Sequence, residues 1–499
     1  MLKMNKILWG VLLVLLPVFP GCVSVGRDFH GGFLPEVGEY TVAPLPLETD
    51  SAPVHGGEAQ HFVDGMDISS QWWTKFQSVE LDALICQALE DSPTLSAAEA
   101  TLREARENVN ARTGSQNYPA ASLGLDSSRF KSSPASFGMP DGEGNILNLH
   151  SASVAVSYTF DIFGGARREI EALKARVDYE KFRLEAARLV LGGNIVTTVI
   201  REAALRAELQ ATKEIIAAQK EQLELIEQQQ AVGGASRSEV LGLRAEVEAV
   251  RATLPVYEKE LGWSRHQLAT LLGRLPSESG SLAQFELSSF VLPVELPLSL
   301  PSDFARQRPD IRAAEALLQV ASAGVGVATA NLFPQITLGG SYGPQAGRWE
   351  NLFKGESLVW SLAGGLTQPI FNGGSLRARK RGAQAAFDQA AANYRQTVLG
   401  AFQNIADTLH ALETDASVLK AQASAYSAAE ESLMLARKQF QSGAISYSVV
   451  LNAQQQYQRA SIALVRAQAA RLSDTAALFQ SLGGGWENRD QDVLPGERE

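Results

Sequence analysis

One five-residue stretch fits a motif of hydrolytic enzymes. Gly339 to Gly343 reads Gly-Gly-Ser-Tyr-Gly, which matches G-x-S-x-G, the pattern that exposes a nucleophilic serine on a sharp turn between a strand and a helix. Here Ser341 lies inside a run in which apolar and small residues alternate, and Pro344 follows it. The match is therefore interpreted as a chance one within a strand, and we assign no catalytic residue and expect no enzymatic activity.

The histidines of the chain lack the paired spacing of metal ligands. His55 and His61 lie close together, but the surrounding segment is rich in glycine, proline and polar residues, which favours surface side chains over a zinc site. The sequence contains no glycine-rich loop of the Walker type that would cradle a phosphate. We therefore expect neither a metal ion nor a cofactor. The six histidines are His30, His55, His61, His150, His266 and His410.

The amino terminus has the features of a secretory signal. Lys3 and Lys6 precede an apolar run, Ile7–Leu16, that is too short for a comfortable membrane span. Residues 1–21 are therefore expected to be removed on export. Gly21 immediately precedes the first cysteine, Cys22, and this arrangement favours lipoprotein processing, in which Cys22 is lipidated and becomes the mature amino terminus.

The lipidation site has an alternative. Phe19 and Pro20 stand where such sites usually carry leucine and a small residue, so simple cleavage without lipidation stays open. Val23, rather than an aspartate, follows the cysteine and suits sorting to the outer membrane. If Cys22 is lipidated, the second cysteine, Cys86, has no disulfide partner within the chain, and we expect it to be a buried small hydrophobe.

The composition is that of an acidic, folded protein. Of the 499 residues, 45% are hydrophobic and 20% are charged. Removing the two signal lysines from 44 basic residues leaves 42, against 55 acidic residues, so the mature chain has a net charge of −13. An acidic chain without a basic cluster is a poor ligand for nucleic acid, so we expect no nucleic-acid partner.

Two stretches without proline are long enough to form unusually long helices. In Ser375–Ser442, apolar residues recur in steps of four, three and seven, which is the coiled-coil repeat. At about 1.5 Å per residue such a helix would reach roughly 100 Å. Ala166–Gln229 is almost as long, and a glycine turn and a returning helix follow each stretch. We therefore predict two helical hairpins, at about 166–272 and 375–482. The seam of the second hairpin is Val398, Phe402, Ile405, Leu409, Leu412, Leu419, Tyr426 and Leu433.

The chain repeats one plan twice. Four pairs of anchors recur in the same order, which indicates an internal duplication. Each copy, 81–274 and 301–484, is expected to run helix, strand, loop, strand, long helix, glycine turn and long helix. An amino-terminal arm at 22–80, a linker at 275–300 and a tail at 485–499 complete the mature chain. The paired anchors are Pro93 with Pro309, Tyr118-Pro119 with Phe333-Pro334, Ile162-Phe163 with Ile370-Phe371, and Gly234-Ala235 with Gly443-Ala444.

Between the helices of each copy, apolar residues alternate with small or polar ones. Alternation over about ten residues is typical of transmembrane barrel strands, and a half-buried sheet of a soluble protein gives the same pattern. The export signal and the long helices favour the membrane. The strands are expected at about 118–130, 150–163, 333–343 and 358–371.

Four strands per chain cannot close a barrel, and a bilayer does not tolerate open strand edges. Oligomerisation is therefore required. Two chains would give eight strands, a barrel filled by its own side chains, whereas three would give twelve strands and an open lumen. We expect three chains.

Several short motifs are informative in combination. They are Trp72-Trp73, Leu300–Phe304, Arg308–Glu315, Pro369–Gly374, Gly443–Asn452 and Leu482–Trp486. Together they closely resemble motifs of the outer membrane factor family, in its NodT-type lipoprotein branch. The resemblance covers nearly the whole mature chain. It implies an α+β fold, in which a trimeric 12-stranded transmembrane β-barrel is continuous with a long periplasmic α-helical barrel, and an equatorial belt built from the arm, the linker and the tail.

The resemblance also implies a function. Such a homotrimer is the exit duct of a tripartite efflux system, and it passively conducts small molecules delivered by an inner-membrane pump and a periplasmic adaptor across the outer membrane. The chain would be lipid-anchored in the outer membrane of a Gram-negative-type cell, with its tunnel in the periplasm. A type I protein secretion duct shares this architecture. A lipid-anchored periplasmic coiled-coil scaffold, with the strands in a soluble sheet, is an alternative from a different class.

Two sites in the hairpins are expected. The glycine turns are the farthest points of both hairpins and should contact the adaptor, with Gly234 and Gly443 at positive φ. The tip residues are Gly234, Ala235, Gly443, Ala444 and Ile445. Related ducts carry a tyrosine and an arginine before the tip glycine, and a leucine and an aspartate in the returning helix. The matching positions of a periplasmic gate are Phe440, Gln441, Ser448 and Asn452, which carry no charge. Drift at a tolerant site is the alternative.

Overall fold

The computed structural model describes residues 25–26, 28–29, 31–32, 40–41, 46–133, 144–298 and 307–488. The signal segment, Cys22 and the whole Leu300–Phe304 motif lie outside the described residues, as does most of the tail. The chain divides into two compact units, which we describe separately. The first comprises residues 1–32, 102–180 and 314–394, and the second comprises residues 33–101, 181–313 and 395–499.

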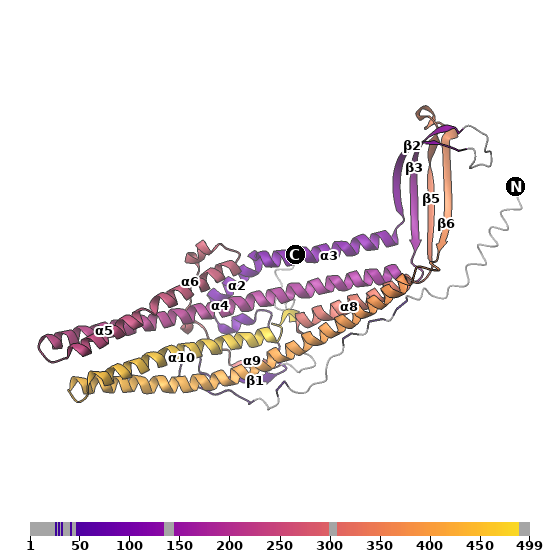
Figure 1. Cartoon of the computed structure of the whole chain (residues 1–499). Coiled ribbons are helices and arrows are strands. Elements are labelled where there is room, and N and C mark those ends of the chain that lie inside the picture. The colour runs from indigo at the N-terminus through magenta and orange to yellow at the C-terminus, as the bar shows by residue number, and fades with distance from the viewer. Residues whose placement is uncertain are drawn as a thin grey trace. The chain divides into compact units, whose positions relative to one another are not determined.

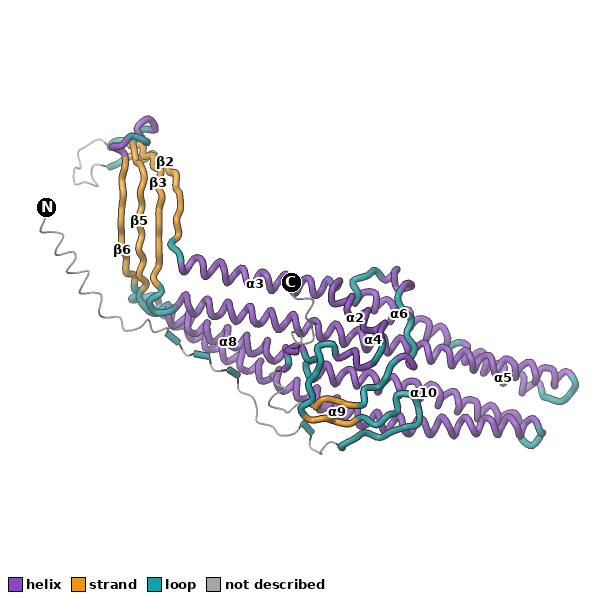
Figure 2. The backbone as a smooth tube through the Cα atoms, turned by 180° about the vertical axis from the view of Figure 1, so that it is seen from behind, coloured by secondary structure: helices purple, strands orange, loops and turns teal. Residues whose placement is uncertain are grey.

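The first unit contains a four-stranded antiparallel sheet (Figures 1 and 2). Its strands follow the order β2-β3-β5-β6, so each copy of the repeat contributes one hairpin and the two hairpins meet along β3 and β5. In register, Val156 lies between Ala121 on one side and Gly340 on the other. The strands are β2 (Ala120–Lys131), β3 (Ile146–Phe160), β5 (Gln335–Ala346) and β6 (Leu358–Thr367).

The last strand is shorter than the sequence suggested. β6 ends at Thr367, so Ile370 and Phe371 lie outside the sheet and are 97% and 91% exposed. Pro369 supplies the reason, because a proline has no N–H to donate to the ladder. At the start of the first long helix, the Asp161 carboxylate accepts hydrogen bonds from the backbone N–H groups of Ala166 and Arg167 at 3.1 and 2.9 Å. These bonds satisfy two donors that the first turn of a helix leaves free.

Long helices form both hairpins. The ascending helices are α4 (Gly165–Ala231) and α9 (Ser375–Gln441), each of 67 residues, or about 100 Å at 1.5 Å per residue. α10 (Tyr447–Ser481) returns from α9 as one continuous helix. The seam predicted along α9 is confirmed for six of its eight residues, because Val398, Ile405, Leu409, Leu412, Leu419 and Leu433 are all buried.

The return of the first hairpin differs from the prediction. It is broken into α5 (Arg237–Arg251) and α6 (Leu254–Leu271), where a continuous helix to about residue 272 was expected. Pro255 lies in the first turn of α6. A proline inside a helix removes one hydrogen bond and clashes with the preceding turn, whereas the first turn accommodates it. The second copy has no proline at this place and stays continuous.

Segments far apart in the sequence meet in the second unit. β1 (His61–Asp64) pairs in parallel with β4 (Glu295–Leu298), and Trp72 stacks on Phe479 of α10 with ring centroids 5.6 Å apart. The Asn488 side chain donates a hydrogen bond to the Ile68 carbonyl at 2.9 Å. The described parts of the arm and the linker therefore pack together with the first residues of the tail. The remaining helices are α2 (Val79–Asp91), α3 (Pro93–Asn117) and α8 (Pro309–Ala330).

Cys86 of α2 and Arg471 of α10 differ in their burial. Cys86 is only half-buried, and its thiol lies 3.8 Å from an oxygen of Asp82, so the expectation of a fully buried hydrophobe was wrong. Arg471 on α10 is fully buried. Its guanidinium donates to the Thr49 hydroxyl at 3.0 Å and to the Glu58 carbonyl. A buried cation on α10 thus holds the polar backbone of the arm.

Candidate functional site

One face of the four-stranded sheet is apolar and uncovered. Its large side chains are between 43% and 75% exposed, which is far more than a protein in water leaves open on one contiguous surface. They share one parity in every strand, as the register requires. The residues are Leu123, Leu125, Val154, Val156, Leu338, Tyr342, Trp360, Leu362 and Leu366.

Aromatic side chains lie toward both ends of the apolar face. Tyr342 is directly opposite Trp360 and also pairs with Val154. Phe160 lies six residues after Val154 on β3 and contacts Tyr158 edge to face, with ring centroids 5.0 Å apart. Six residues of strand span about 20 Å, which is close to the roughly 25 Å apolar band between the aromatic girdles of membrane barrels.

The opposite face carries small and hydroxylated residues. The Ser341 and Ser361 hydroxyls are 2.8 Å apart across β5 and β6, which confirms that Ser341 belongs to a strand and not to a nucleophile elbow. Four apolar residues on this face, Phe130, Leu147, Leu149 and Val359, lie near the ends that carry the connections within each hairpin. The rest include Ser122, Gly124, Ser151, Ser153, Ala155, Ser157, Thr159, Thr337, Gly339, Gly343, Ala363, Gly365 and Thr367.

Both hairpin turns use the same backbone geometry. After α4, the Gly234 N–H donates to the Gln229 carbonyl at 2.7 Å, and Gly233 has a φ of 81°. After α9, the Ala444 N–H donates to the Gln439 carbonyl at 2.9 Å, and Gly443 has a φ of 73°. This is the helix ending in which one left-handed residue, usually glycine, lets the next N–H reach back to the last turn.

In the first turn, one residue differs from the prediction. Gly443 has positive φ as predicted, but in the first hairpin the left-handed residue is Gly233 and not Gly234. Gly233 is thus the structural counterpart of Gly443, and Ser236 that of Ser446, since each serine immediately precedes its returning helix. The one-residue error arose because two adjacent glycines allow two alignments of the repeat.

The expected tip residues lie at these turns. Gly234, Gly443 and Ala444 are exposed, whereas Ala235 and Ile445 are half-buried against an apolar cluster. This cluster contains residues of both hairpins, so the two turns are held by one core. Its buried members are Ile226, Val240, Leu243, Val247, Leu433, Ala436, Tyr447, Val450 and Ala453.

The expected gate residues have different surroundings. Phe440 is half-buried and contacts the Tyr447 ring edge to face at 5.5 Å, so its ring belongs to the tip core. Gln441 is exposed and lines a cavity. Ser448 and Asn452 are exposed on α10, and the Ser448 hydroxyl lies 2.7 Å from that of Ser446. The structure thus leaves three neutral polar groups at the surface of this hairpin.

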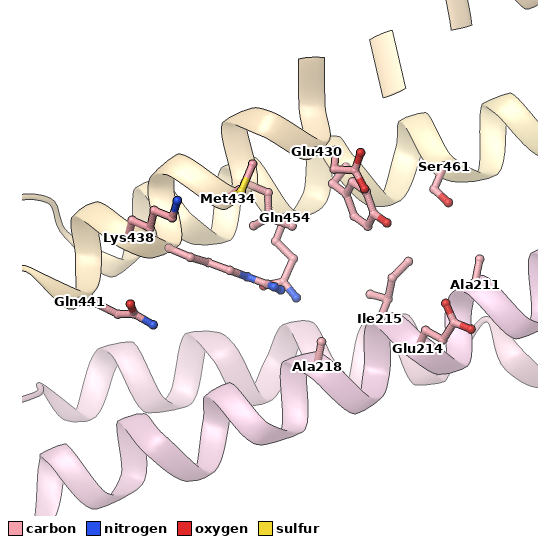
Figure 3. Close-up of a pocket in the computed structure, with 13 residues that line it drawn as sticks. Ala211, Glu214, Ile215, Ala218, Glu430, Met434, Lys438, Gln441, Gln454 and Ser461 are labelled. Carbon is pink, nitrogen blue, oxygen red and sulfur yellow. The ribbon is translucent and has the colours of Figure 1, made fainter. Parts of the chain in front are cut away.

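A cavity of about 520 Å³ separates the hairpins just behind the tips. Figure 3 shows Ala218 and Glu214 of α4 on one side, with Lys438 and Gln454 of the second hairpin facing them. Acidic and basic side chains are mixed in its wall, so no single sign of charge dominates. The lining residues are Ala211, Glu214, Ile215, Ala218, Glu430, Leu433, Met434, Arg437, Lys438, Gln441, Gln454, Tyr457 and Ser461.

An ion pair joins the two hairpins near this cavity. Arg466 of α10 makes a bidentate ion pair with the buried Glu208 of α4. Its Nε and Nη2 atoms donate to the two carboxylate oxygens at 3.0 and 2.9 Å, and this contact raises the pKa of Arg466. Nearer the tip, burial raises the pKa of Tyr447 to about 12. Its hydroxyl has no hydrogen-bond partner among the described residues. Neither side chain was singled out from the sequence, because no local pattern indicates which residues of another helix it will contact.

No metal-binding group emerges from the described part of the chain. Within it, no three or more His, Cys, Asp or Glu side chains are grouped so as to hold a metal ion. His150 instead lies 2.8 Å from the Ser127 hydroxyl and stacks on Trp349. His55 contacts the Leu287 carbonyl at 2.9 Å, so it fastens the arm to the linker.

Comparison with known proteins gives a consistent result. The family described as outer membrane efflux protein matches residues 84–274 and 300–484. The chain is similar to the pyoverdine export outer membrane protein OpmQ of Pseudomonas aeruginosa, with 31% identity over 435 residues, covering 86% of this chain and 90% of the relative. It is 27% identical to the probable outer membrane lipoprotein SilC of Salmonella typhimurium, over 83% and 88% of the two chains. The solved outer-membrane channel OprN superposes with a TM-score of 0.82 at 27% identity, covering 93% of this chain and all of that one.

Proposed function

Because the chain belongs to the outer membrane efflux protein family, we propose that three copies form the exit duct of a tripartite efflux system. The observation that carries this proposal is the apolar, aromatic-edged face of a four-stranded sheet whose outer strands, β2 and β6, pair on one side only among the described residues. Three such sheets joined edge to edge make a closed barrel of twelve strands, which leaves no unpaired backbone in the bilayer.

The barrel determines which face meets lipid. The apolar face would point outward and the hydroxylated face would line a water-filled lumen. The long hairpins would continue the duct as an α-helical barrel in the periplasm, with the packed arm, linker and tail as an equatorial belt. A relative named for pyoverdine export supports small molecules as cargo. The duct would conduct them passively, since the energy enters at the inner-membrane pump.

We assign the hairpin tips to the periplasmic adaptor. Gly233 and Gly443 replace the expected pair as the residues on which the turns depend, with Gly234, Ala235, Ala444 and Ile445 as their neighbours. Gly443→Val should strain the turn by roughly 1–2 kcal/mol, because a side chain disfavours the left-handed conformation. We expect export to fall while trimer assembly is unchanged.

The experiment restores export in a strain that lacks the duct gene but retains its adaptor and pump. The wild-type chain should restore cargo efflux and Gly443→Val should not, at equal trimer levels in the outer membrane. Gly382→Ala is the matched control, because a Cβ at this position of α9 would meet no atom within 4 Å. A wild-type chain that restores nothing, and that needs no detergent to stay soluble as an assembled oligomer, would favour the periplasmic scaffold.

Lipidation of Cys22 belongs to the same proposal. The SilC relative is described as a probable outer membrane lipoprotein, and Gly21-Cys22 follows the apolar signal. Cys22→Ser should abolish incorporation of labelled palmitate. The barrel should still hold the variant in the outer membrane, since one acyl chain is a weak anchor compared with a membrane-spanning barrel. Absence of label from the wild type would exclude the lipoprotein assignment.

The gate is proposed at the second hairpin, where Phe440 and Gln441 lie just before the tip and Ser448 and Asn452 just after it. Three copies of Asn452 offer no ring of carboxylates at this point of the duct, so we expect no block by divalent cations at the gate. Asn452→Asp would place three acids near one axis, where mutual repulsion raises their pKa and a bound cation relieves it. The measurement is single-channel conductance in planar bilayers with and without magnesium. Equal magnesium block in wild type and variant would contradict the assignment of Asn452.

A further inference from the structure

A single carboxylate stands on the hydroxylated face of the sheet. Asp126 of β2 is exposed and pairs in register with Ser151 of β3. A Cβ built on Gly124 would lie 3.5 Å from the Asp126 Oδ2 atom and 4.0 Å from the Ser153 hydroxyl oxygen. The carboxylate therefore lies over Gly124, on the same face as the serines. Among the residues of the four strands, no other charged side chain has this parity.

Among the described residues of the four strands, no basic side chain on this face offsets the charge. The basic residues of β2, Arg129 and Lys131, have the opposite parity and belong to the apolar face near its outer end. In the connection between β5 and β6, basic and acidic side chains are equal in number, with Arg348 and Lys354 against Glu350 and Glu356. In the described part of the sheet and this loop, Asp126 therefore supplies the net negative charge on the hydroxylated face.

We propose that Asp126 makes the outer mouth of the duct selective for cations over anions. The inference rests on the proposed trimer, in which three copies of Asp126 form one ring in the lumen. The row of Asp126 lies three residues, or about 10 Å, beyond the Leu123 row on the side away from the helices. It is level with Gln345 near the end of β5, and five residues before the end of β2. A water-filled pore with low-dielectric walls focuses the field of such a ring, and rings of carboxylates favour cations in channels.

The strength of the effect depends on salt. The Debye length is about 30 Å at 0.01 M salt but about 3 Å at 1 M, so the ring acts across the whole lumen only in dilute salt. Asp126 would thus assist the last step of export for cationic cargo and oppose the entry of anions from outside. Neutral cargo would be unaffected.

The first experiment measures the reversal potential of the purified full-length trimer in a planar bilayer under a gradient of dilute KCl. The wild type should prefer potassium by roughly fivefold, and Asp126→Asn should bring this ratio close to one. Asp126→Asn combined with Ser151→Asp should restore the preference, because it moves the carboxylate to the neighbouring strand at the same height. An identical reversal potential in wild type and Asp126→Asn overturns the inference, whereas a wild-type trimer without any conductance counts against the proposed duct.

A second experiment is independent of the periplasmic gate. Ser153→Cys is introduced beside the Asp126 row in a Cys86→Ser background, and whole cells are treated from outside with a cationic or an anionic thiosulfonate reagent. The cationic reagent should react faster, and Asp126→Asn should reduce the ratio of the two rates severalfold. An unchanged ratio overturns the role of Asp126. A cysteine that neither reagent reaches would instead show that this face does not line a lumen, which is a failure of the proposed function.

Discussion

Replacing Val156 with arginine is expected to prevent assembly of the trimer in the outer membrane. Val156 lies in the middle of β3, on the apolar face of the sheet, and its side chain is 43% exposed in the single chain. In the proposed barrel it faces lipid near the middle of the bilayer. An arginine at such a site costs about 2–4 kcal/mol, and the trimer would repeat this cost three times.

The matched control is the next residue along the strand. Ser157→Arg places the same side chain on the hydroxylated face, where it can remain in water, and assembly should be close to that of the wild type. Heat-modifiable mobility of the trimer and the urea dependence of folding into lipid vesicles measure both variants. Leu338→Arg, on β5 and in register with Tyr158, should behave like Val156→Arg. Equal tolerance of arginine at positions 156 and 157 would favour a sheet in water.

The elements of this fold could be predicted where a local pattern is sufficient. Strands are recognisable because alternate residues meet different surroundings, so Val156 and Ser157 already differ in the sequence. The long helices are recognisable because α4 and α9 contain no proline. Pro255 also indicated the break before α6, but the prediction of a continuous returning helix did not take it into account. The predicted hairpin placed Pro255 inside a continuous helix, whereas prolines are common in the first turn of a new helix.

The candidate site was harder to predict from the sequence, because its geometry depends on residues far away in the chain or on an alignment that must be right to one residue. Choosing Gly233 over Gly234 requires knowledge of which N–H reaches Gln229, and both glycines tolerate the turn. The burial of Phe440 follows from contacts with the returning helix, and no pattern in α9 indicates it. Arg471 is the extreme case. Its contacts Gln60 and Thr49 lie 411 and 422 residues away in the chain.

A pH dependence is built into the surroundings of Arg471. Burial, together with a hydrogen bond to Asp474, raises the pKa of Asp415 to about 7, while the charge of Arg471 opposes this shift. An acid whose pKa is higher in the folded than in the unfolded state makes its stabilising contribution at low pH and loses it as the pH rises through the folded pKa. Between pH 4 and 7 Asp415 therefore lowers the stability progressively, and the Arg471 charge limits the loss.

Replacing Arg471 with methionine is accordingly expected to loosen the arm from α10. The guanidinium is fully buried, and its removal takes the Arg471 donor away from the Glu58 carbonyl and the Gln60 side-chain oxygen. The Thr49 hydroxyl also loses this donor but still accepts from the Gln60 backbone N–H at 3.0 Å. We expect a loss of about 3 kcal/mol, since each unsatisfied buried group costs about 1–3 kcal/mol and part of the loss relaxes. The loss should grow as the pH rises above about 7, where Asp415 ionises beside Arg471 in the wild type but lacks this cation in the variant.

Urea denaturation of the detergent-solubilised trimer, with cleavage of the arm by a protease as a second readout, measures the effect. Arg459→Met is the control, because Arg459 is an exposed residue of the same helix, and it should change the stability by less than about 0.5 kcal/mol. Asp415→Asn combined with Arg471→Met should remove the pH dependence while leaving most of the loss at pH 5. If Arg471→Met and Arg459→Met are equally stable, the buried arginine does not hold the arm, and the belt must depend on the stack of Trp72 on Phe479 and on the pairing of β1 with β4 instead.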